Sequence, residues 1–475
     1  MSQFAFRTTL ASLSLALLAA LSACNGGGGS DTTSTAGVGS GGTGYASGTV
    51  TGFGSVVVDG VTIDDRSASV DVEVSPGVSG DSDVLLGQRV EVETDKDGLA
   101  KHIHIMAEVM GPVQSVDSVN LKLVVAGQTV YANTDADKGP VTVYGGGYTA
   151  FGSIAVSDLV EVHGIPKLDV STGKPVLQAT RIEKKSSLSF VRVSSVVSDL
   201  STTGKTFKLG TLTVDYSAAN VVPASRQIAN GQRVVAYGPS INSGTLAATL
   251  VRIAEPKAQG VSAQVGGVVS NYNSAALTFE VNGVTINAKN AVIVPANRSI
   301  ANGTYVRVKG SYADSGELVA SQVQIRKKND DDMLHEVSLK GSVANYVSLS
   351  SFSVRGVPVD AHAATLVGCG AGLKDEIYVE VEGSISATGI VASKVTCKSE
   401  PAAAELELRG SVGSLDLVKR TFVLTTSTRV VTVSWTDLTS LRGVVLASLS
   451  GSTVEVEGYL QSNGVLVARK ISLEK

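Results

Sequence analysis

The residues of this sequence best suited to holding a metal ion are two of its five histidines. His102 and His104 lie two positions apart within residues 99–105, where apolar and polar residues alternate. This alternation predicts a strand, on which both imidazoles would project from one face and could chelate a metal. No Cys, Asp or His stands nearby at ligand spacing, and corresponding positions of similar segments hold polar residues such as Ser321 and Gln322. We therefore favour a polar outer face, keep His102 and His104 as weak metal candidates, and expect no cofactor.

The sequence contains no residue pattern typical of an enzyme. Neither G-x-S-x-G nor H-E-x-x-H occurs, and no recognisable motif places a pair of carboxylates. The segment from Asp95 to Gly98 begins like a calcium-binding loop, but Met106 stands where that loop requires glutamate. A hairpin turn is the better interpretation there, and the three aspartates at 330–332 are interpreted as a solvated linker. We expect no catalytic residue.

The N-terminal segment has the features of an export signal. Arg7 precedes an apolar stretch over residues 10–21, which is too short to span a membrane but has the length of a signal-peptide core. Residues 21–24, Leu-Ser-Ala-Cys, resemble the bacterial lipobox in order, spacing and position. The resemblance implies a signal peptide over residues 1–23, cleavage before Cys24 and acylation of Cys24. Two or three acyl chains would anchor the chain stably in a membrane.

We expect the mature protein to be lipid-anchored in the cell envelope. Asn25, rather than an aspartate, follows Cys24, and by analogy with lipoproteins of enteric type this favours the outer membrane. The analogy leaves open whether the chain faces the periplasm or the cell surface. Residues 24–47 are rich in Gly, Ser and Thr, which predicts a flexible tether between the lipid and the first folded unit.

The other two cysteines, Cys369 and Cys397, are expected to form a disulfide. An exported chain meets an oxidising compartment, where such bonds form and persist. The bond would close a loop of about 28 residues and contribute roughly 3 kcal/mol by restricting the unfolded chain. A catalytic thiol is disfavoured because His362 is the one histidine close in sequence and no oxyanion motif accompanies it.

The elements that would carry these residues recur six times along the chain. Each copy opens with a short strand that begins near Gly48, Gly111, Ser195, Gly267, Gly341 or Gly410. A hairpin follows, with Asp59-Gly60 in the first copy and Asn282-Gly283 in the fourth at positions that need a positive φ. Two alternating strands close each copy, with Val on one face and charged residues on the other, which indicates strands buried on one side. The modules are expected over residues 48–107, 108–188, 189–257, 262–328, 336–399 and 405–475.

The predicted fold is all-β. Five or six antiparallel strands in roughly 65 to 80 residues leave edges with unpaired backbone N–H and C=O groups unless the sheet closes. We therefore expect a tandem array of about six small OB-like or SH3-like β-barrel modules. A sheet shared between neighbouring copies, as in a β-solenoid, is the alternative. The linkers at 326–332 and 399–404 are polar or built of small residues, which favours separate modules.

A family resemblance is visible in the first copy. Residues 48–63, followed by residues 87–93, resemble the bacterial repeat family catalogued as domain of unknown function 5666. Similar segments occur in the other copies, more loosely in the second and third. The resemblance implies exported β-rich modules in lipid-anchored envelope proteins, and it implies no activity and no site residue.

The expected function is that of a non-enzymatic envelope protein whose modules act as a spacer or a multivalent interaction array. The expected partners are the membrane, through the lipidated N-terminus, and an envelope protein or glycan. Nucleic acid is excluded by charge, since 39 basic and 43 acidic residues give a net charge of −4. Glycan or envelope-polymer binding through OB-like faces is the alternative, with aromatic platforms at Tyr272, Tyr305, Tyr312 and Tyr346. An enzyme with a site between modules ranks third.

Overall fold

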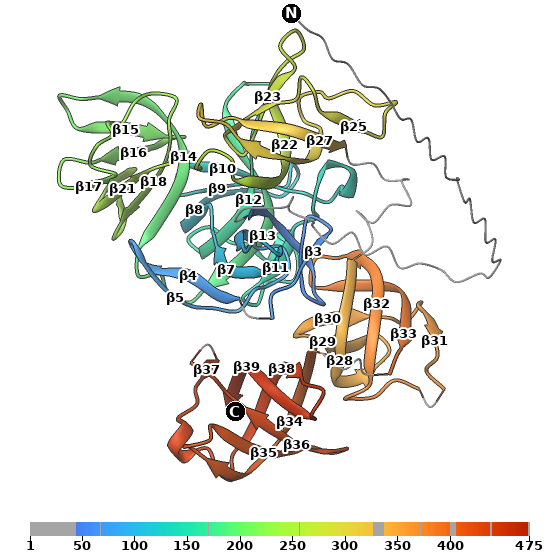
Figure 1. Cartoon of the computed structure of the whole chain (residues 1–475). Helices are drawn as coiled ribbons and strands as arrows, with labels where there is room; N and C mark the ends of the chain where they lie inside the picture. The colour runs from blue at the N-terminus through green and yellow to red at the C-terminus, as the bar shows by residue number, and fades with distance from the viewer. Residues whose placement is uncertain are drawn as a thin grey trace, which may run out of the picture. The chain divides into compact units, whose positions relative to one another are not determined.

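The computed structural model describes residues 44–66, 68–169, 171–255, 257–325, 337–370, 372–399, 405–437 and 439–473 (Figure 1). Within these ranges the chain forms strands joined by turns, and its helical elements there are three short 3-10 turns. No helix in this part of the chain is long and apolar enough to cross a membrane. The all-β class predicted from the alternating pattern is confirmed.

The first three copies contain twenty-one strands and two 3-10 turns. Copy one consists of β1 (Gly44–Gly52), β2 (Val56–Val58), β3 (Val61–Ile63), β4 (Ser69–Ser75), β5 (Val78–Asp81), β6 (Arg89–Thr94) and β7 (Ala100–Ile105). Copy two consists of β8 (Val109–Asp117), β9 (Lys122–Val125), β10 (Gln128–Ala132), η1 (Ala136–Lys138), β11 (Val143–Gly145), η2 (Phe151–Ser153), β12 (Leu159–Leu168) and β13 (Pro175–Lys185). Copy three consists of β14 (Val191–Ser201), β15 (Thr206–Leu209), β16 (Leu212–Asp215), β17 (Asn220–Val222), β18 (Arg233–Gly238), β19 (Ile241–Asn242), β20 (Thr245–Ala247) and β21 (Leu250–Ile253).

The last three copies have six strands each. Copy four consists of β22 (Ser262–Asn273), β23 (Thr278–Val281), β24 (Val284–Asn287), β25 (Val292–Val294), β26 (Tyr305–Tyr312) and β27 (Leu318–Ile325). Copy five consists of β28 (Val337–Ser348), β29 (Ser351–Val354), β30 (Val357–Asp360), β31 (Thr365–Val367), β32 (Tyr378–Ile385) and β33 (Ile390–Cys397). Copy six consists of β34 (Glu405–Asp416), β35 (Thr421–Thr425), β36 (Val430–Ser434), β37 (Ser440–Arg442), η3 (Leu446–Ser448), β38 (Thr453–Leu460) and β39 (Val465–Leu473).

Copy five illustrates the strand topology that most copies share. Its first strand, β28, pairs antiparallel with β29 and with β32, while β29 pairs with β30 and β32 pairs with β33. The ring closes because β30 runs parallel beside β33, and the short β31 also runs parallel beside β33. Copies two, four and six repeat this closing parallel pair. The expectation of wholly antiparallel modules is therefore wrong at this pair.

The sheets do not stop at the boundaries between copies. β1 of copy one pairs parallel with β22 of copy four through Gly44–Ser47, so β1 begins ahead of the expected start at Gly48. β8 of copy two pairs antiparallel with β14 of copy three at Val109 and Met110. Two sheets thus hold two copies each, and copies five and six have a sheet of their own. The prediction of separate barrels is wrong for copies one to four. Copies two and three share a sheet as the solenoid-type alternative predicts, whereas copies one and four share a sheet although they are not consecutive in the chain. The composition of the linkers did not predict this pairing between copies, because it carries no information about strand edges that are remote in sequence.

Copy one differs from the others in the strand beside β7. There β4 spans seven residues and continues through a hairpin into β5, and it runs parallel to β7 in the register Ser69↔His102 and Asp71↔His104. The corresponding strands β11, β17, β25, β31 and β37 have three residues each. This longer hairpin is a local addition to the common frame.

The cores are lined by Val, Leu and Ile from the alternating strands. In each of copies three to six a single buried phenylalanine occupies the second position of the second strand, and these residues are Phe207, Phe279, Phe352 and Phe422. A second aromatic ring lies beside each of them, with ring centroids 5.6 to 6.4 Å apart. The few aromatic residues of the sequence therefore serve largely to fill the cores of the copies.

A buried polar cluster joins copies one and four at the hairpin turn of copy one. Asp59 and Gly60 have the positive φ values, 49° and 78°, that the Asp-Gly pair predicts, and Asp59 is buried. Its carboxylate accepts hydrogen bonds from Thr49 N at 3.2 Å and from the Tyr305 hydroxyl at 2.5 Å. Arg307 of copy four donates to the Asp59 carbonyl oxygen at 3.1 Å. Because a buried carboxylate needs such partners, this cluster stabilises the junction of the two copies.

We expect Tyr305→Phe to loosen this junction without unfolding copy four. Removing the hydroxyl leaves a buried carboxylate oxygen short of a donor, which costs about 1 to 3 kcal/mol. Hydrogen–deuterium exchange should show faster exchange of β1 and β22 amides. The control is Tyr272→Phe, since Tyr272 packs on Phe279 within copy four. Equal exchange in both variants would contradict the assignment.

Candidate functional site

His102, His104 and Asp71 form the one group of three or more metal-ligating side chains within bonding range of one another in the described part of the chain. β7 places the two imidazoles on one face with ring centroids 6.4 Å apart, and the parallel neighbour β4 places Asp71 beside them. The Oδ1 atom of Asp71 lies 2.9 Å from His102 Nε2 and 3.0 Å from His104 Nδ1. The potential ligand atoms all lie within 4.8 Å of one another.

The electrostatic setting of this group keeps the carboxyl ionised. Partial burial acts to raise the pKa of Asp71, but hydrogen bonds from Ser79 and His104 outweigh it and hold the pKa below its usual range. On the other side of β7, Glu91 lies opposite His104 and Glu93 lies opposite His102 in the register of β6. The β6 side of the cluster therefore carries two carboxylates, of which Glu91 is paired with Lys257 at 3.1 Å.

The sequence shows no Asp at ligand spacing from the two histidines, but the structure places Asp71 beside them. Asp71 precedes them by more than thirty residues and reaches them through a parallel strand pair, which sequence spacing cannot reveal. The alternation of Val with polar residues over β4 was the signal that could have identified the strand. The turn at Asp95 agrees with its prediction, because the Asp95 carboxylate accepts from Asp97 N and Leu99 N as in a hairpin turn.

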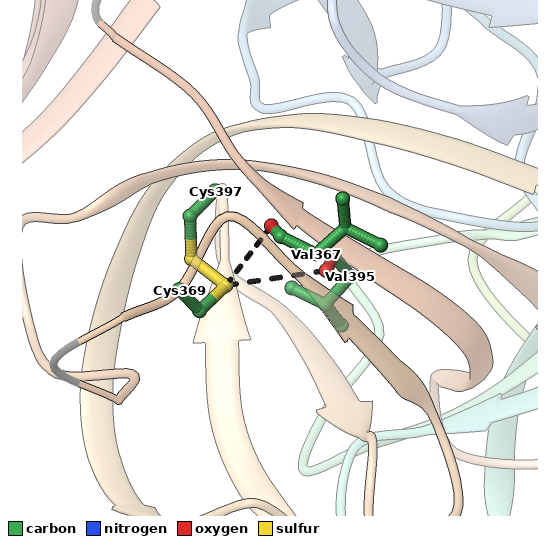
Figure 2. Close-up of a disulfide and its surroundings, with 4 residues drawn as sticks. All are labelled: Val367, Cys369, Val395 and Cys397. Atoms are coloured by element: carbon green, nitrogen blue, oxygen red, sulfur yellow. Dashed lines mark hydrogen bonds between the residues drawn. A yellow bond between two sulfur atoms is a disulfide. The ribbon is translucent and has the colours of Figure 1, made fainter.

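Cys369 and Cys397 are joined by a disulfide in the structure (Figure 2). Their Cα atoms lie 5.1 Å apart, with Cys369 just after β31 and Cys397 at the end of β33. Figure 2 shows the Cys369 sulfur near the carbonyl oxygens of Val367 and Val395, at 3.4 and 4.0 Å. The bond fastens the loop after β31 to the last strand of copy five, so its role in the structure is a covalent brace.

A second polar site lies where copies five and six meet. Ser342, fully buried on β28, donates its hydroxyl to the Glu407 carbonyl oxygen at 2.8 Å and accepts from Glu407 N at 2.7 Å. The Glu407 carboxyl is buried too and accepts from Gly356 N at 3.1 Å. Burial, followed by the charges of Glu457 and Glu455, raises the pKa of Glu407 to about 8. This carboxyl is thus held largely neutral at neutral pH.

The tyrosines proposed as ligand platforms do not form one. Tyr305 and Tyr312 are buried, with 2% and 4% of their surface exposed. Tyr272 and Tyr346 each pack against the core phenylalanine of their own copy, at centroid distances of 6.4 and 6.1 Å. These rings support the cores, and the expectation of aromatic platforms is wrong for the two buried tyrosines. Cys24 and the aspartates at 330–332 lie outside the described residues.

The fold and sites together define a tandem-repeat protein of sheet modules. The chain belongs to the family described as "Domain of unknown function (DUF5666)", whose model matches residues 110–183, 266–324, 340–396 and 409–472, more than half of the sequence. These ranges fall in copies two, four, five and six, whereas the resemblance argued from the sequence rests mainly on copy one.

The remaining comparisons add little to the family. No curated protein matches the chain. A solved structure, "drosophila Unr CSD456", is similar at 13% identity over 47% of this chain and 98% of its own length, with a TM-score of 0.12.

Removing the disulfide should destabilise copy five selectively. Cys369→Ala combined with Cys397→Ala opens a loop with a sequence separation of 28, and loop-closure entropy predicts a loss of roughly 3 kcal/mol. Local stability can be measured by hydrogen exchange of β32 and β33 peptides. Reductant acting on the unaltered chain should reproduce the effect, and copy six, with no cysteine, serves as the internal control. The role as a brace would be refuted by unchanged exchange in β32 and β33.

Replacing Glu407 by Gln should remove a pH dependence of stability. The unfolded carboxyl ionises near 4.5 and the folded one near 8, so its contribution is complete below pH 4.5 and is lost as the pH rises through 8. At pH 8 we expect Glu407→Gln to be more stable than the unaltered chain by on the order of 3 to 5 kcal/mol, with little difference at pH 4.5. Thermal unfolding across this pH range measures it, with Glu317→Gln in copy four as control. A constant difference at all pH values would rule the explanation out.

Proposed function

We propose that this protein is a non-enzymatic, lipid-anchored envelope protein whose six copies act as an interlocked spacer or multivalent interaction array. The single observation that supports the array most directly is the sharing of sheets, by which β1 pairs with β22 and β8 pairs with β14. Copies that merely followed one another on a tether would need no such pairing. A chain built this way presents its modules at fixed spacing, which suits simultaneous contact with a repetitive partner.

Ion pairs between copies support the same proposal. Glu73, on the hairpin that is special to copy one, lies 3.3 Å from Arg192 and 3.5 Å from Arg252 of copy three. Glu108 of copy two lies 2.7 Å from Arg233 of copy three. Burial acts to raise the pKa of Glu108, but Arg233 and Arg192 outweigh it and keep the pKa below its usual range. Charges paired in this way penalise separation of the copies, because each partner would be left without its counter-charge.

Each copy is proposed to be OB-like. The supporting observation is the order of strand pairing, in which the third and last strands of a copy close the ring in parallel, as β30 and β33 do in copy five. The expected ligand class of such faces is an envelope polymer or glycan, and the exposed charged faces of the alternating strands would provide the contacts. The buried tyrosines argue against recognition by aromatic stacking.

The anchoring part of the proposal rests on Cys24. Acylation there would hold the array at a membrane, proposed to be the outer membrane, and the residues between Cys24 and β1, which begins at Gly44 rather than after residue 47, would provide reach between the lipid and the first copy. The membrane and an envelope protein or glycan are the proposed partners. We propose no catalytic role for any residue.

Anchoring predicts that Cys24→Ala moves the protein from the membrane fraction to the soluble envelope fraction. The unaltered chain should stay with the membrane, and globomycin, which blocks the lipoprotein signal peptidase, should cause its precursor to accumulate. Cys369→Ala is the matched control, because it removes a cysteine without touching the signal. Soluble recovery of the unaltered chain, insensitive to globomycin, would overturn the anchoring. A hydrolytic activity of the purified chain in a broad substrate panel would overturn the non-enzymatic part.

A further inference from the structure

The hydrogen bonds around His102, His104 and Asp71 allow a protonation state in which the cluster can bind a cation. The Ser69 hydroxyl lies 3.3 Å from the Lys101 carbonyl oxygen and 2.9 Å from His102 Nδ1. A serine has one hydroxyl proton, so when it donates to Lys101, His102 must donate its Nδ1–H to the serine oxygen. In a neutral imidazole the Nε2 lone pair then faces the Asp71 carboxylate at 2.9 Å. In that tautomer two acceptors face each other and a cation between them would be favourable, whereas in the other tautomer Ser69 donates to Nδ1 and Nε2–H donates to Asp71.

The hydrogen bond between Ser69 and His102 is of the kind that orients metal-binding histidines in proteins. A hydrogen bond at one ring nitrogen fixes the tautomer and orients the other nitrogen as the ligand. Here Ser69 engages Nδ1 and directs Nε2 towards Asp71 and His104. The separations of 2.9 and 3.0 Å between the carboxylate oxygen and the ring nitrogens are hydrogen-bond distances. The potential ligand atoms, all within 4.8 Å of one another, can converge on one metal at about 2.0 to 2.2 Å after small side-chain shifts.

The common frame of the copies does not require this cluster. In copy four the strand pairing places Gln322 and Gln324 at the positions of His102 and His104, with Val292 and Val294 where copy one has Ser69 and Asp71. The pairing thus corrects the sequence alignment, which put Ser321 and Gln322 there. Neither imidazole nor carboxylate occurs at these positions of copy four, although its last two strands and the parallel strand beside them pair in the same way. The polar cluster of copy one is therefore an addition and not a structural necessity.

The cluster is open to solvent on one side. The side chains of His102 and His104 are 39% and 27% exposed, while Asp71 is 14% exposed. A metal ion can reach the site directly, and water can fill positions that the protein leaves vacant. The neighbouring cations are engaged elsewhere, Lys101 with Asp95 at 3.0 Å and Lys257 with Glu91 at 3.1 Å.

The donor set selects a class of metal. Two imidazole nitrogens and one carboxylate oxygen suit Zn²⁺ and related divalent transition ions, whereas Ca²⁺ and Mg²⁺ prefer oxygen ligands alone. Three protein ligands leave at least one coordination position for water or for a group on a partner. We propose that copy one binds a divalent transition metal ion, of the Zn²⁺ class, through His102 Nε2, His104 Nδ1 and Asp71 Oδ1, with Ser69 orienting His102.

The test is Zn²⁺ binding to the full chain carrying Cys24→Ser, so that the one cysteine outside the disulfide cannot compete for the metal. After treatment with chelator and desalting, titration with Zn²⁺ against a competing dye should give about one ion per chain. Asp71→Asn and His104→Ala should each weaken binding by more than about 10-fold, and Ser69→Ala by about 10-fold. Asp71→Asn keeps the size of the side chain, so misfolding would not explain its effect.

His362 provides the matched control. Its Nδ1 lies 2.7 Å from Asp360 Oδ1, which is the same imidazole–carboxylate pair without a second imidazole. His362→Ala should therefore leave the affinity and the stoichiometry unchanged. Visible absorption of the Co²⁺-loaded chain should likewise depend on His102 and His104 and not on His362. The proposal is overturned if no Zn²⁺ is bound, if binding survives both Asp71→Asn and His104→Ala, or if His362→Ala abolishes it.

Discussion

The architecture depends on one constraint, that backbone N–H and C=O groups buried along the edges of strands need hydrogen-bond partners. The opening strand of every copy except copy three meets it by pairing with the second strand on one edge and the penultimate strand on the other, as β28 does with β29 and β32. In copies two, four, five and six a parallel pair between the third and last strands then closes the ring. Where the opening strand extends beyond that ring, as β1 does at Gly44–Ser47, its spare edge pairs with another copy. Module closure and module sharing are therefore two results of the same requirement.

Polar residues buried between copies act together with this backbone pairing. Asp59 with Tyr305, Glu73 with Arg192, and Ser342 with Glu407 each place a group that needs a partner in one copy and the partner in another. Hydrophobic surfaces would hold copies together in many orientations, whereas hydrogen bonds and paired charges restrict the contact to one. This is the physical basis for describing the chain as an interlocked array. Asp71 of the proposed metal cluster lies on the hairpin that also carries Glu73, so this local addition to copy one contributes both to a junction and to a candidate ligand site.

The repeated pattern of the sequence predicted much of the fold. Val alternating with charged residues identified the last two strands of the copies, and Asp59-Gly60 identified a turn whose positive φ values the structure has. Local patterns specify local structure because neighbouring residues share one strand or one turn. The parallel closing pair, the sharing of sheets and the approach of Asp71 to His104 were not predicted, since each joins segments whose separation in the chain carries no periodic signal.

For the sites, the chain by itself identified residue types, and the tertiary structure decided what surrounds them. Two imidazoles on one strand face follow from spacing alone, but whether they have a third ligand depends on which strand lies beside β7. Tyr305 and Tyr312 are residues of the type that forms a binding platform. They are nevertheless buried, because the strands that carry them face a core and a neighbouring copy. The sequence alone therefore determined the all-β class, the six copies and their turns, which are local properties. The tertiary structure decided how the edges pair, which polar groups are buried and where a cation finds ligands, because those depend on contacts between residues remote in the chain.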